Sequence, residues 1–276
     1  MGLISILLTC LSVCGVGAYL YYYLAKKRRR REWAACGRVV VHCPPPGALT
    51  PCVSPFAVKL MTYLRMAGIP YQLDHTEPLW ETWLTPWITL EGGEELGDSG
   101  VVVARLQRRG GAAHPSSGLS ASRSAVARAM MVMVEDHLTW CLRVWRIKVD
   151  AGRNLFEGAT SPPSWYVRLG LPLYVWLRSR TLNQQGIGRL PHAIVQRAVW
   201  EDLNALSGYL GDKLYLMGQD MMEVDCTVFA QMVNILNNYQ RSPYATMLRD
   251  EFPNLVQYVD RIKGKIWPDW DDCLAH

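Results

Sequence analysis

The chain opens on a long uncharged stretch that ends in a block of basic residues. Residues 2–25 contain no charged side chain, and residues 26–31 are all Lys or Arg. As a helix, the uncharged stretch would extend about 36 Å, which exceeds the ~30 Å hydrocarbon core of a bilayer. Four tyrosines within residues 19–23 are typical of a membrane interface. The pattern predicts a transmembrane anchor over residues 2–25, followed by a basic stop-transfer segment and tether over residues 26–37.

A cleaved signal peptide is the main alternative for this stretch. Signal peptides carry their positive charge before the apolar run and small residues at the cleavage site. Here the charge comes after the run, and bulky tyrosines precede it. A nuclear localisation signal is a further interpretation of the basic block. The positive-inside rule favours a single-pass membrane protein whose soluble part faces the cytosol, in the outer mitochondrial membrane or the endoplasmic reticulum.

The pattern after the tether predicts a small α/β domain over residues 38–109. A β-branched run at residues 38–43 indicates a buried strand, and a Pro-Pro-Pro-Gly segment ends it. Ser54 and Pro55 are typical of the cap and first position of a helix. Gly92-Gly93 indicates a hairpin turn. The expected order is strands at 38–43, 71–73, 87–90 and 94–96, with helices starting after Ser54 and after Ser99.

The rest of the chain reads as helical. Residues 110–122 are rich in Gly, Ala and Ser and predict a linker. Beyond it, apolar residues recur at helical spacing, which predicts an all-α domain over residues 123–270. The expected helices are 123–149, 166–182, 191–210, 225–239 and 254–267.

Composition and charge exclude several classes of protein. Half of the 276 residues are apolar, so the chain has enough apolar side chains to build a core and is not disordered. The net charge of +5 comes from the basic block, because the other 23 basic residues nearly balance 24 acidic ones. A nucleic-acid-binding face is therefore not expected. Eight scattered cysteines show no zinc spacing, so we expect reduced thiols and no metal site.

A βαβ-ββα module followed by a helical domain resembles the glutathione transferases, whose first domain is thioredoxin-like. Several stretches resemble one branch more closely, the failed axon connections family, which is related to metaxins. This family is glutathione-transferase-like, membrane-associated and linked to axonal development, and the resemblance implies these properties here. The stretches are SPFAVKLMTYLRMAGIPY (54–71), MVEDHLTW (133–140), QGIGR (185–189), LGDKLYLMG (210–218), DCTVF (225–229) and RIKGKIWPDW (261–270).

The resemblance places Ser54 at the corner between strand and helix where transferases keep their catalytic residue. A hydroxyl at the positive end of a helix would hydrogen-bond the glutathione sulfur, lower the thiol pKa and promote attack on an electrophile. The alternative is that Ser54 only caps the helix.

The resemblance also implies further glutathione-binding residues. Thr85-Pro86 matches the cis-proline turn, where the backbone of residue 85 would pair with the cysteinyl group of glutathione. Asp98 and Ser99 match the γ-glutamyl site, although they could equally serve only as a helix cap. His137 and Trp140 would line the electrophile pocket, the alternative for His137 being a buried, hydrogen-bonded histidine.

Two features weaken the case for catalysis. Transferases hold the glycine carboxylate of glutathione with a basic residue after the second strand, but residues 74–84 contain no Lys or Arg. Asp225 matches the acid of a Ser/Thr-x-x-Asp capping box whose partner position is Met222, so only half of that box is present. We expect Asp225 to serve folding.

Two functions follow from these expectations. The first is a membrane-anchored, non-catalytic interaction module that faces the cytosol, binds protein partners there and takes part in axonal development. The alternative is a membrane-bound glutathione transferase that uses Ser54 to activate glutathione. The resemblance also allows a homodimer.

Overall fold

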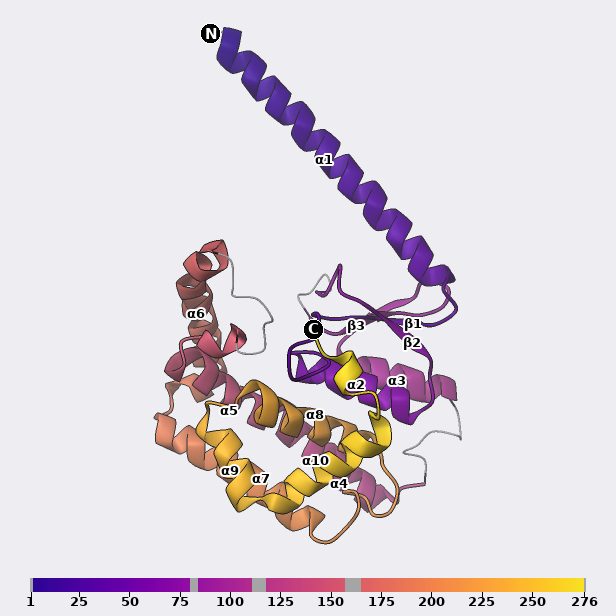
Figure 1. Cartoon of the computed structure of the whole chain (residues 1–276), viewed down its shortest axis with the longest axis vertical. Coiled ribbons are helices and arrows are strands. Elements are labelled where there is room, and N and C mark those ends of the chain that lie inside the picture. The colour runs from indigo at the N-terminus through magenta and orange to yellow at the C-terminus, as the bar shows by residue number, and fades with distance from the viewer. Residues whose placement is uncertain (1, 80–83, 111–117, 157–164, 276) are drawn as a thin grey trace.

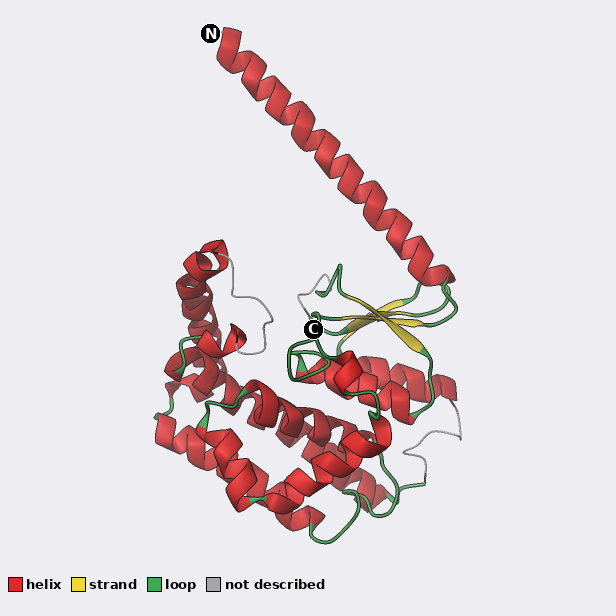
Figure 2. Cartoon of the chain, viewed as in Figure 1, coloured by secondary structure: helices red, strands yellow, loops and turns green. Residues whose placement is uncertain are grey.

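A thioredoxin-like sheet domain and a helical domain form the body of the molecule, and a long helix projects from it (Figures 1 and 2). The computed structural model describes residues 2–79, 84–110, 118–156 and 165–275. The α/β domain and the all-helical domain expected from the sequence are both confirmed. Most of the predicted linker over residues 110–122 lies outside the described residues.

The sheet has four strands in the order β2-β1-β3-β4. β1 pairs in parallel with β2 and antiparallel with β3, and β3 forms a hairpin with β4. Helices α2 and α3 lie between the sheet and the helical domain (Figure 1). The bounds are β1 (Val39–His42), α2 (Pro55–Met66), β2 (Tyr71–Asp74), β3 (Trp87–Thr89), β4 (Glu95–Gly97) and α3 (Ser99–Gly110).

Strand alternation divides the apolar side chains of the sheet between its two faces. Val39, Val41 and Ile88 belong to the main core with α2 and α3. Val40 and Trp87 point to the opposite face, as period-2 alternation requires, and form a separate cluster there. Both faces of this small sheet are therefore buried.

The helical domain is built around one buried helix, α8, which packs against α2. Its first helix is a continuous run from Ala121 to Val149, made of α4 (Ala121–Val132), η2 (Met133–Leu138), α5 (Thr139–Val144) and η3 (Trp145–Val149). The remaining elements are η4 (Arg153–Phe156), α6 (Trp165–Gln185), η5 (Ile187–Arg189), α7 (His192–Leu210), α8 (Glu223–Asn238), α9 (Pro243–Glu251), α10 (Pro253–Ile266) and η6 (Asp271–Cys273).

The amino-terminal segment is one helix, α1 (Gly2–Ala35), which runs through the basic block without a break. In the ranges that the structure describes, no helix combines the length and the apolar character needed to cross a membrane. The transmembrane anchor predicted over residues 2–25 is therefore not supported. Within the basic stop-transfer segment and tether predicted over residues 26–37, the chain stays helical as far as Ala35, and three of the six cations contact the sheet domain.

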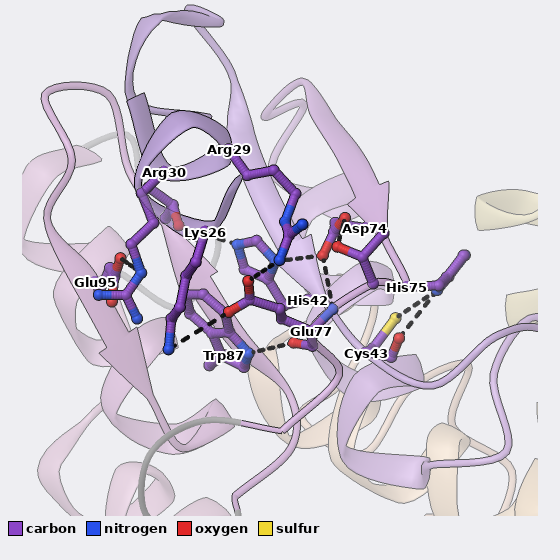
Figure 3. A network of polar contacts seen from close by, with 12 residues as sticks. Lys26, Arg29, Arg30, His42, Cys43, Asp74, His75, Glu77, Trp87 and Glu95 are labelled. Carbon is purple, nitrogen blue, oxygen red and sulfur yellow. Dashed lines mark hydrogen bonds and ion pairs between the residues drawn. The ribbon is translucent and has the colours of Figure 1, made fainter. Parts of the chain in front are cut away.

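The carboxyl-terminal turns of α1 are held on the sheet by ion pairs (Figure 3). The Lys26 and Arg29 side chains reach the two carboxylate oxygens of Glu77, at 3.8 and 2.7 Å. Arg30 Nε lies 3.2 Å from Glu95 Oε1. Three residues later, Trp33 is buried against the outer face of the sheet. Half of the basic block thus binds the protein's own sheet domain.

A buried histidine lies under this contact. The ring of His42 is stacked on Trp87 at 3.6 Å between centroids, and Trp33 meets it edge-on at 4.3 Å. His42 Nδ1 lies 2.9 Å from Asp74 Oδ2, and its Nε2 lies 3.0 Å from Thr89 Oγ1. A neutral ring satisfies both contacts, because Nδ1–H donates to Asp74 and Nε2 accepts from the hydroxyl.

We expect acid to weaken the fold through this histidine. Burial lowers the pKa of His42 below its ordinary 6.5, against the opposing effect of Asp74. The folded protein then binds fewer protons than the unfolded chain, so the free energy of unfolding falls as the pH drops below about 6.5. Urea midpoints at pH 7.5 and 5.5 test this. The difference between the two pH values should shrink in His42→Gln, and an unchanged difference would contradict the expectation.

Candidate functional site

A cavity lies between the sheet domain and the helical domain, and we call it the interdomain cavity. Its volume is about 490 Å³, within the ~300–1,000 Å³ usual for small-molecule sites. The sheet domain contributes the start of α2, the start of α3 and the turn before β3. The helical domain contributes α5, η3, α6 and α8.

Ser54 lies on the cavity at the amino terminus of α2. Its backbone has the extended conformation of a cap residue, and its carbonyl accepts hydrogen bonds from Ala57 and Val58. Its hydroxyl, however, makes no capping hydrogen bond to the helix. The capping role considered for this side chain is therefore absent, and the hydroxyl remains available to a ligand in the cavity.

Thr85 adds an unsatisfied group beside the same cavity. The Thr85–Pro86 peptide bond is cis, as predicted. Thr85 Oγ1 is buried and has no hydrogen-bond partner among the described residues. A buried hydroxyl without a partner costs about 1–3 kcal/mol, so a bound ligand or water is expected to satisfy it.

Gln231 is a second unsatisfied group, and it was not predicted from the sequence. The residue lies on α8, lines the cavity and is 3% exposed. Its Nε2 has no hydrogen-bond partner within the described part of the chain. A polar residue in the otherwise apolar run FAQMV was the signal that could have revealed it.

Asp98 and Ser99 line the cavity at the start of α3. Asp98 has a positive φ of 71°, and its Oδ1 accepts hydrogen bonds from the backbone N–H of Gly100 and Val101 at 2.9 and 3.1 Å. Asp98 therefore caps α3, which is one of the two roles predicted for it from the sequence. Its position on the cavity also leaves its second carboxylate oxygen available to a ligand.

Of the two residues predicted to line an electrophile pocket, the structure brings only Trp140 to the cavity. His137 is absent from the lining, and its Nδ1 lies 2.7 Å from Asp202 Oδ2 on α7. The side chain is 49% exposed, so it is hydrogen-bonded but not buried. The π-helical turn of η2 carries it toward α7 and away from the cavity.

Three arginines on the helical side of the cavity were not predicted from the sequence. Arg143 and Arg146 lie one turn apart on α5 and η3, and Arg178 comes from α6. We call these three residues the arginine wall. Burial lowers the pKa of Arg143, and the neighbouring Arg146 and Arg178 lower it further. Arg143 and Arg146 are neighbours in the sequence, whereas Arg178 approaches them from a distant helix. No sequence pattern predicts that long-range approach.

The two described acids of the segment that starts at the end of β2 have partners elsewhere than in the cavity. Asp74 binds His42, and Glu77 binds the cations of α1. Residues 80–83 of the predicted segment 74–84 lie outside the described residues. Within the described ranges, no group of three or more His, Cys, Asp or Glu side chains could hold a metal ion.

The chain matches two family models. Residues 55–152 match the glutathione S-transferase N-terminal domain, and residues 199–262 match the glutathione S-transferase C-terminal domain. Among solved structures, a glutathione S-transferase of Methylobacterium radiotolerans in complex with glutathione sulfonate is 16% identical, with a TM-score of 0.56 over 87% of this chain and 96% of that one. This likeness establishes the fold.

Three curated proteins are similar in sequence. Failed axon connections of Drosophila melanogaster is 29% identical over 82% of this chain, which spans 57% of that protein's length. Isoprene-epoxide–glutathione S-transferase of Rhodococcus is 28% identical over 77% of this chain and 92% of the enzyme. Metaxin-2 of Mus musculus is 22% identical over 78% of this chain and 82% of that protein.

Proposed function

Because the chain is a glutathione-transferase-like protein related to Failed axon connections and metaxin-2, we propose that its interdomain cavity binds glutathione and that Ser54 activates the thiol. The observation that carries this proposal is a set of three polar side chains on one cavity. The hydroxyl of Ser54 makes no capping bond, and polar atoms of Thr85 and Gln231 are buried without partners among the described residues.

The proposed mechanism uses the position of Ser54. Its hydroxyl donates a hydrogen bond to the glutathione sulfur, and the positive end of α2 favours the same negative charge. Both interactions stabilise the thiolate and lower the pKa of the thiol. The thiolate then attacks an electrophilic carbon, forms the carbon–sulfur bond and displaces the leaving group or opens a strained ring.

The remaining cavity residues hold the tripeptide. The backbone at Thr85, which lines the cavity, pairs with the cysteinyl unit. Asp98 accepts a hydrogen bond from the γ-glutamyl ammonium, and Ser99 donates to the adjacent carboxylate. Three points of attachment fix the sulfur near Ser54, and such positioning is itself a large part of catalysis.

Ser54→Ala is expected to reduce conjugation of glutathione to a chlorodinitrobenzene substrate by about 10- to 100-fold, because the thiolate loses its hydrogen-bond donor. Retention on glutathione-agarose should change little, since the peptide contacts remain. The matched control is Ser124→Ala on the exposed face of α4, which should conjugate at the wild-type rate. Failure of the wild-type full chain both to bind the resin and to conjugate would overturn the proposal.

A second candidate function, a non-catalytic interaction module, is favoured by a different observation. The segment after β2 lacks a cation for the glycine carboxylate of glutathione, and its acids Asp74 and Glu77 serve the contacts beneath α1. This module would have cytosolic protein partners and a role in axonal development, with the similarity to Failed axon connections as support. These partners and a homodimer stay predictions.

A further inference from the structure

Helix α6 exposes large apolar side chains on the side that faces away from the protein core. Leu169, Leu173 and Leu177 follow one another at intervals of four residues, which places them on one face of the helix. Leu169 is 74% exposed. We call the exposed set on this face the α6 stripe, and its members are Trp165, Leu169, Leu173, Trp176 and Leu177.

The opposite face of α6 already serves the fold. Leu182 is buried in the main core, and Val175 packs against that core. Apolar side chains therefore cover both faces of the helix, whereas a surface helix of a globular protein normally presents polar residues to solvent. Monomeric proteins rarely leave apolar patches larger than about a few hundred Å² uncovered, so an exposed face of this kind marks a binding surface.

The charged residues of α6 all have the same sign. The helix carries Arg168, Arg178 and Arg180 and has no Asp or Glu in its 21 residues. Arg168 and Arg180 are exposed, and the guanidinium carbon of Arg180 lies 4.9 Å from the centre of the Trp176 ring. The α6 stripe is thus an apolar surface bordered by cations. The partner that complements it is apolar and carries negative charge at its edge.

This charge pattern disfavours a second copy of the chain as the partner. Two α6 stripes packed face to face would bring the arginines of both helices together, with no acid on either helix to separate them. Like charges brought together at an interface weaken it. Tryptophan, leucine and arginine on one exposed helix are instead typical of elements that lie at a bilayer surface, where the apolar side chains enter the acyl boundary and the guanidinium groups meet lipid phosphates.

The place of α6 in the molecule favours the same partner. Along the long axis of the molecule, α6 and the projecting part of α1 extend toward the same end (Figure 1). That part of α1 is uncharged as far as residue 25, and its exposed side chains include Tyr19, Leu20 and Leu24. Elements far apart in the sequence therefore present apolar and aromatic side chains toward one end, as an extended, flat partner requires.

We propose that the α6 stripe is a contact site for an anionic lipid bilayer, with its Trp and Leu side chains at the acyl boundary and with Arg168 and Arg180 on lipid phosphates. The contact is peripheral, so it needs no helix that crosses the bilayer. This inference goes beyond the proposed glutathione-binding function, because no residue of the α6 stripe is part of the described lining of the interdomain cavity. The two proposals can therefore fail separately.

Co-sedimentation of the full chain with vesicles tests the proposal. The vesicles contain phosphatidylcholine alone, or phosphatidylcholine with phosphatidylserine as about a third of the lipid. We expect Leu169→Asp to weaken binding to the anionic vesicles about tenfold, because an inserted leucine is replaced by a carboxylate that the phosphates repel. Leu173→Asp should repeat this loss. Ile194→Asp is the matched control, since it places the same charge at an exposed aliphatic position of α7, and it should bind as the wild type does.

The same assay tests the arginines. Arg168→Gln combined with Arg180→Gln should weaken binding to the anionic vesicles about tenfold and leave binding to phosphatidylcholine vesicles within about twofold, because these cations add attraction only where the surface is negative. The matched control combines Arg128→Gln on α4 with Arg197→Gln on α7, both at exposed positions. It should bind both kinds of vesicle within about twofold of the wild type, because salt screens charges that lie far from the bilayer.

A photoactivatable diazirine phospholipid locates the contact independently of α1. After irradiation of the wild-type chain on anionic vesicles, peptides from α6 should carry the label and peptides from α4 should not. Label on α1 peptides without label on α6 peptides would overturn the proposal, as would equal vesicle binding by Leu169→Asp, Leu173→Asp and Ile194→Asp. A wild-type dimer that becomes monomeric in Leu169→Asp, with vesicle binding unchanged, would assign the α6 stripe to a second copy and would also overturn it.

Discussion

Asp225→Ala is expected to lower the free energy of unfolding by about 3 kcal/mol or more. The Asp225 carboxylate is fully buried at the start of α8 and accepts three hydrogen bonds. The donors are the backbone N–H of Leu216 at 2.9 Å, the backbone N–H of Met222 at 2.8 Å and the hydroxyl of Tyr258 at 2.8 Å. Alanine leaves all three buried donors without an acceptor, at about 1–3 kcal/mol each before relaxation.

Urea unfolding followed by circular dichroism measures this effect. Asp220→Ala, an exposed carboxylate five residues away, serves as the control and should change stability by less than about 0.5 kcal/mol. Burial raises the pKa of Asp225, and its hydrogen bonds offset only part of that effect. The expected loss in Asp225→Ala therefore comes from the donors left without an acceptor, and a loss below about 1 kcal/mol would contradict this account.

The second large effect is expected at the contact between the two domains. Lys59 on α2 is 2% exposed, and its Nζ lies 2.6 Å from Glu135 Oε1 on η2. Glu135→Leu leaves the buried ammonium group without its counter-ion, which typically costs about 3–5 kcal/mol. We therefore expect Glu135→Leu to lower the free energy of unfolding by about 3 kcal/mol.

A double variant separates the charge effect from packing. Lys59→Met combined with Glu135→Leu removes both charges, and its stability should return to within about 1 kcal/mol of the wild type. Glu201→Leu, which breaks the exposed pair with Arg197, should cost less than about 0.5 kcal/mol. Equal losses in the single and double variants would contradict this account, since removal of the second charge would then restore nothing.

The elements that the sequence predicted well carry strong local signals. The β-branched run at residues 38–43 appears as β1, and the Ser-Pro start and Gly68 bound α2 as expected. Gly92-Gly93 lies in the turn between β3 and β4. In each case neighbouring residues determine the backbone conformation, through β-branching, proline or a positive φ at glycine.

Features that depend on distant residues were missed. One local feature was also missed: the short helix α9 (Pro243–Glu251) precedes the expected helix near residue 254, and Ser242-Pro243 carries the same start signal as Ser54-Pro55. The arginine wall needs Arg178 to meet Arg143 across the fold. The contact of Trp33 with His42 closes a sheet face that the sequence left unassigned. Such contacts arise from the packing of distant segments, and the spacing of apolar residues along the chain does not predict them.

In the candidate site, too, some residues were predicted correctly and others were not. Ser54, Thr85, Asp98 and Ser99 were placed together by the resemblance alone, and the structure brings all four to one cavity. His137 shares a helix with Trp140 but faces α7, because the wide turn of η2 changes the phase of the helix between its neighbours. Helical spacing alone could not anticipate that shift.

The contact of α1 with the sheet fixes the direction in which this helix projects from the body. The helix is about 50 Å long at ~1.5 Å per residue, and only its last turns touch the sheet, so its free arm stands out from the body (Figure 1). A partner that binds the projecting part of α1 would also set the orientation of the rest of the protein. Loss of the contacts at Glu77, Glu95 and Trp33 together would free α1 to change its angle to the body about residues 36–38.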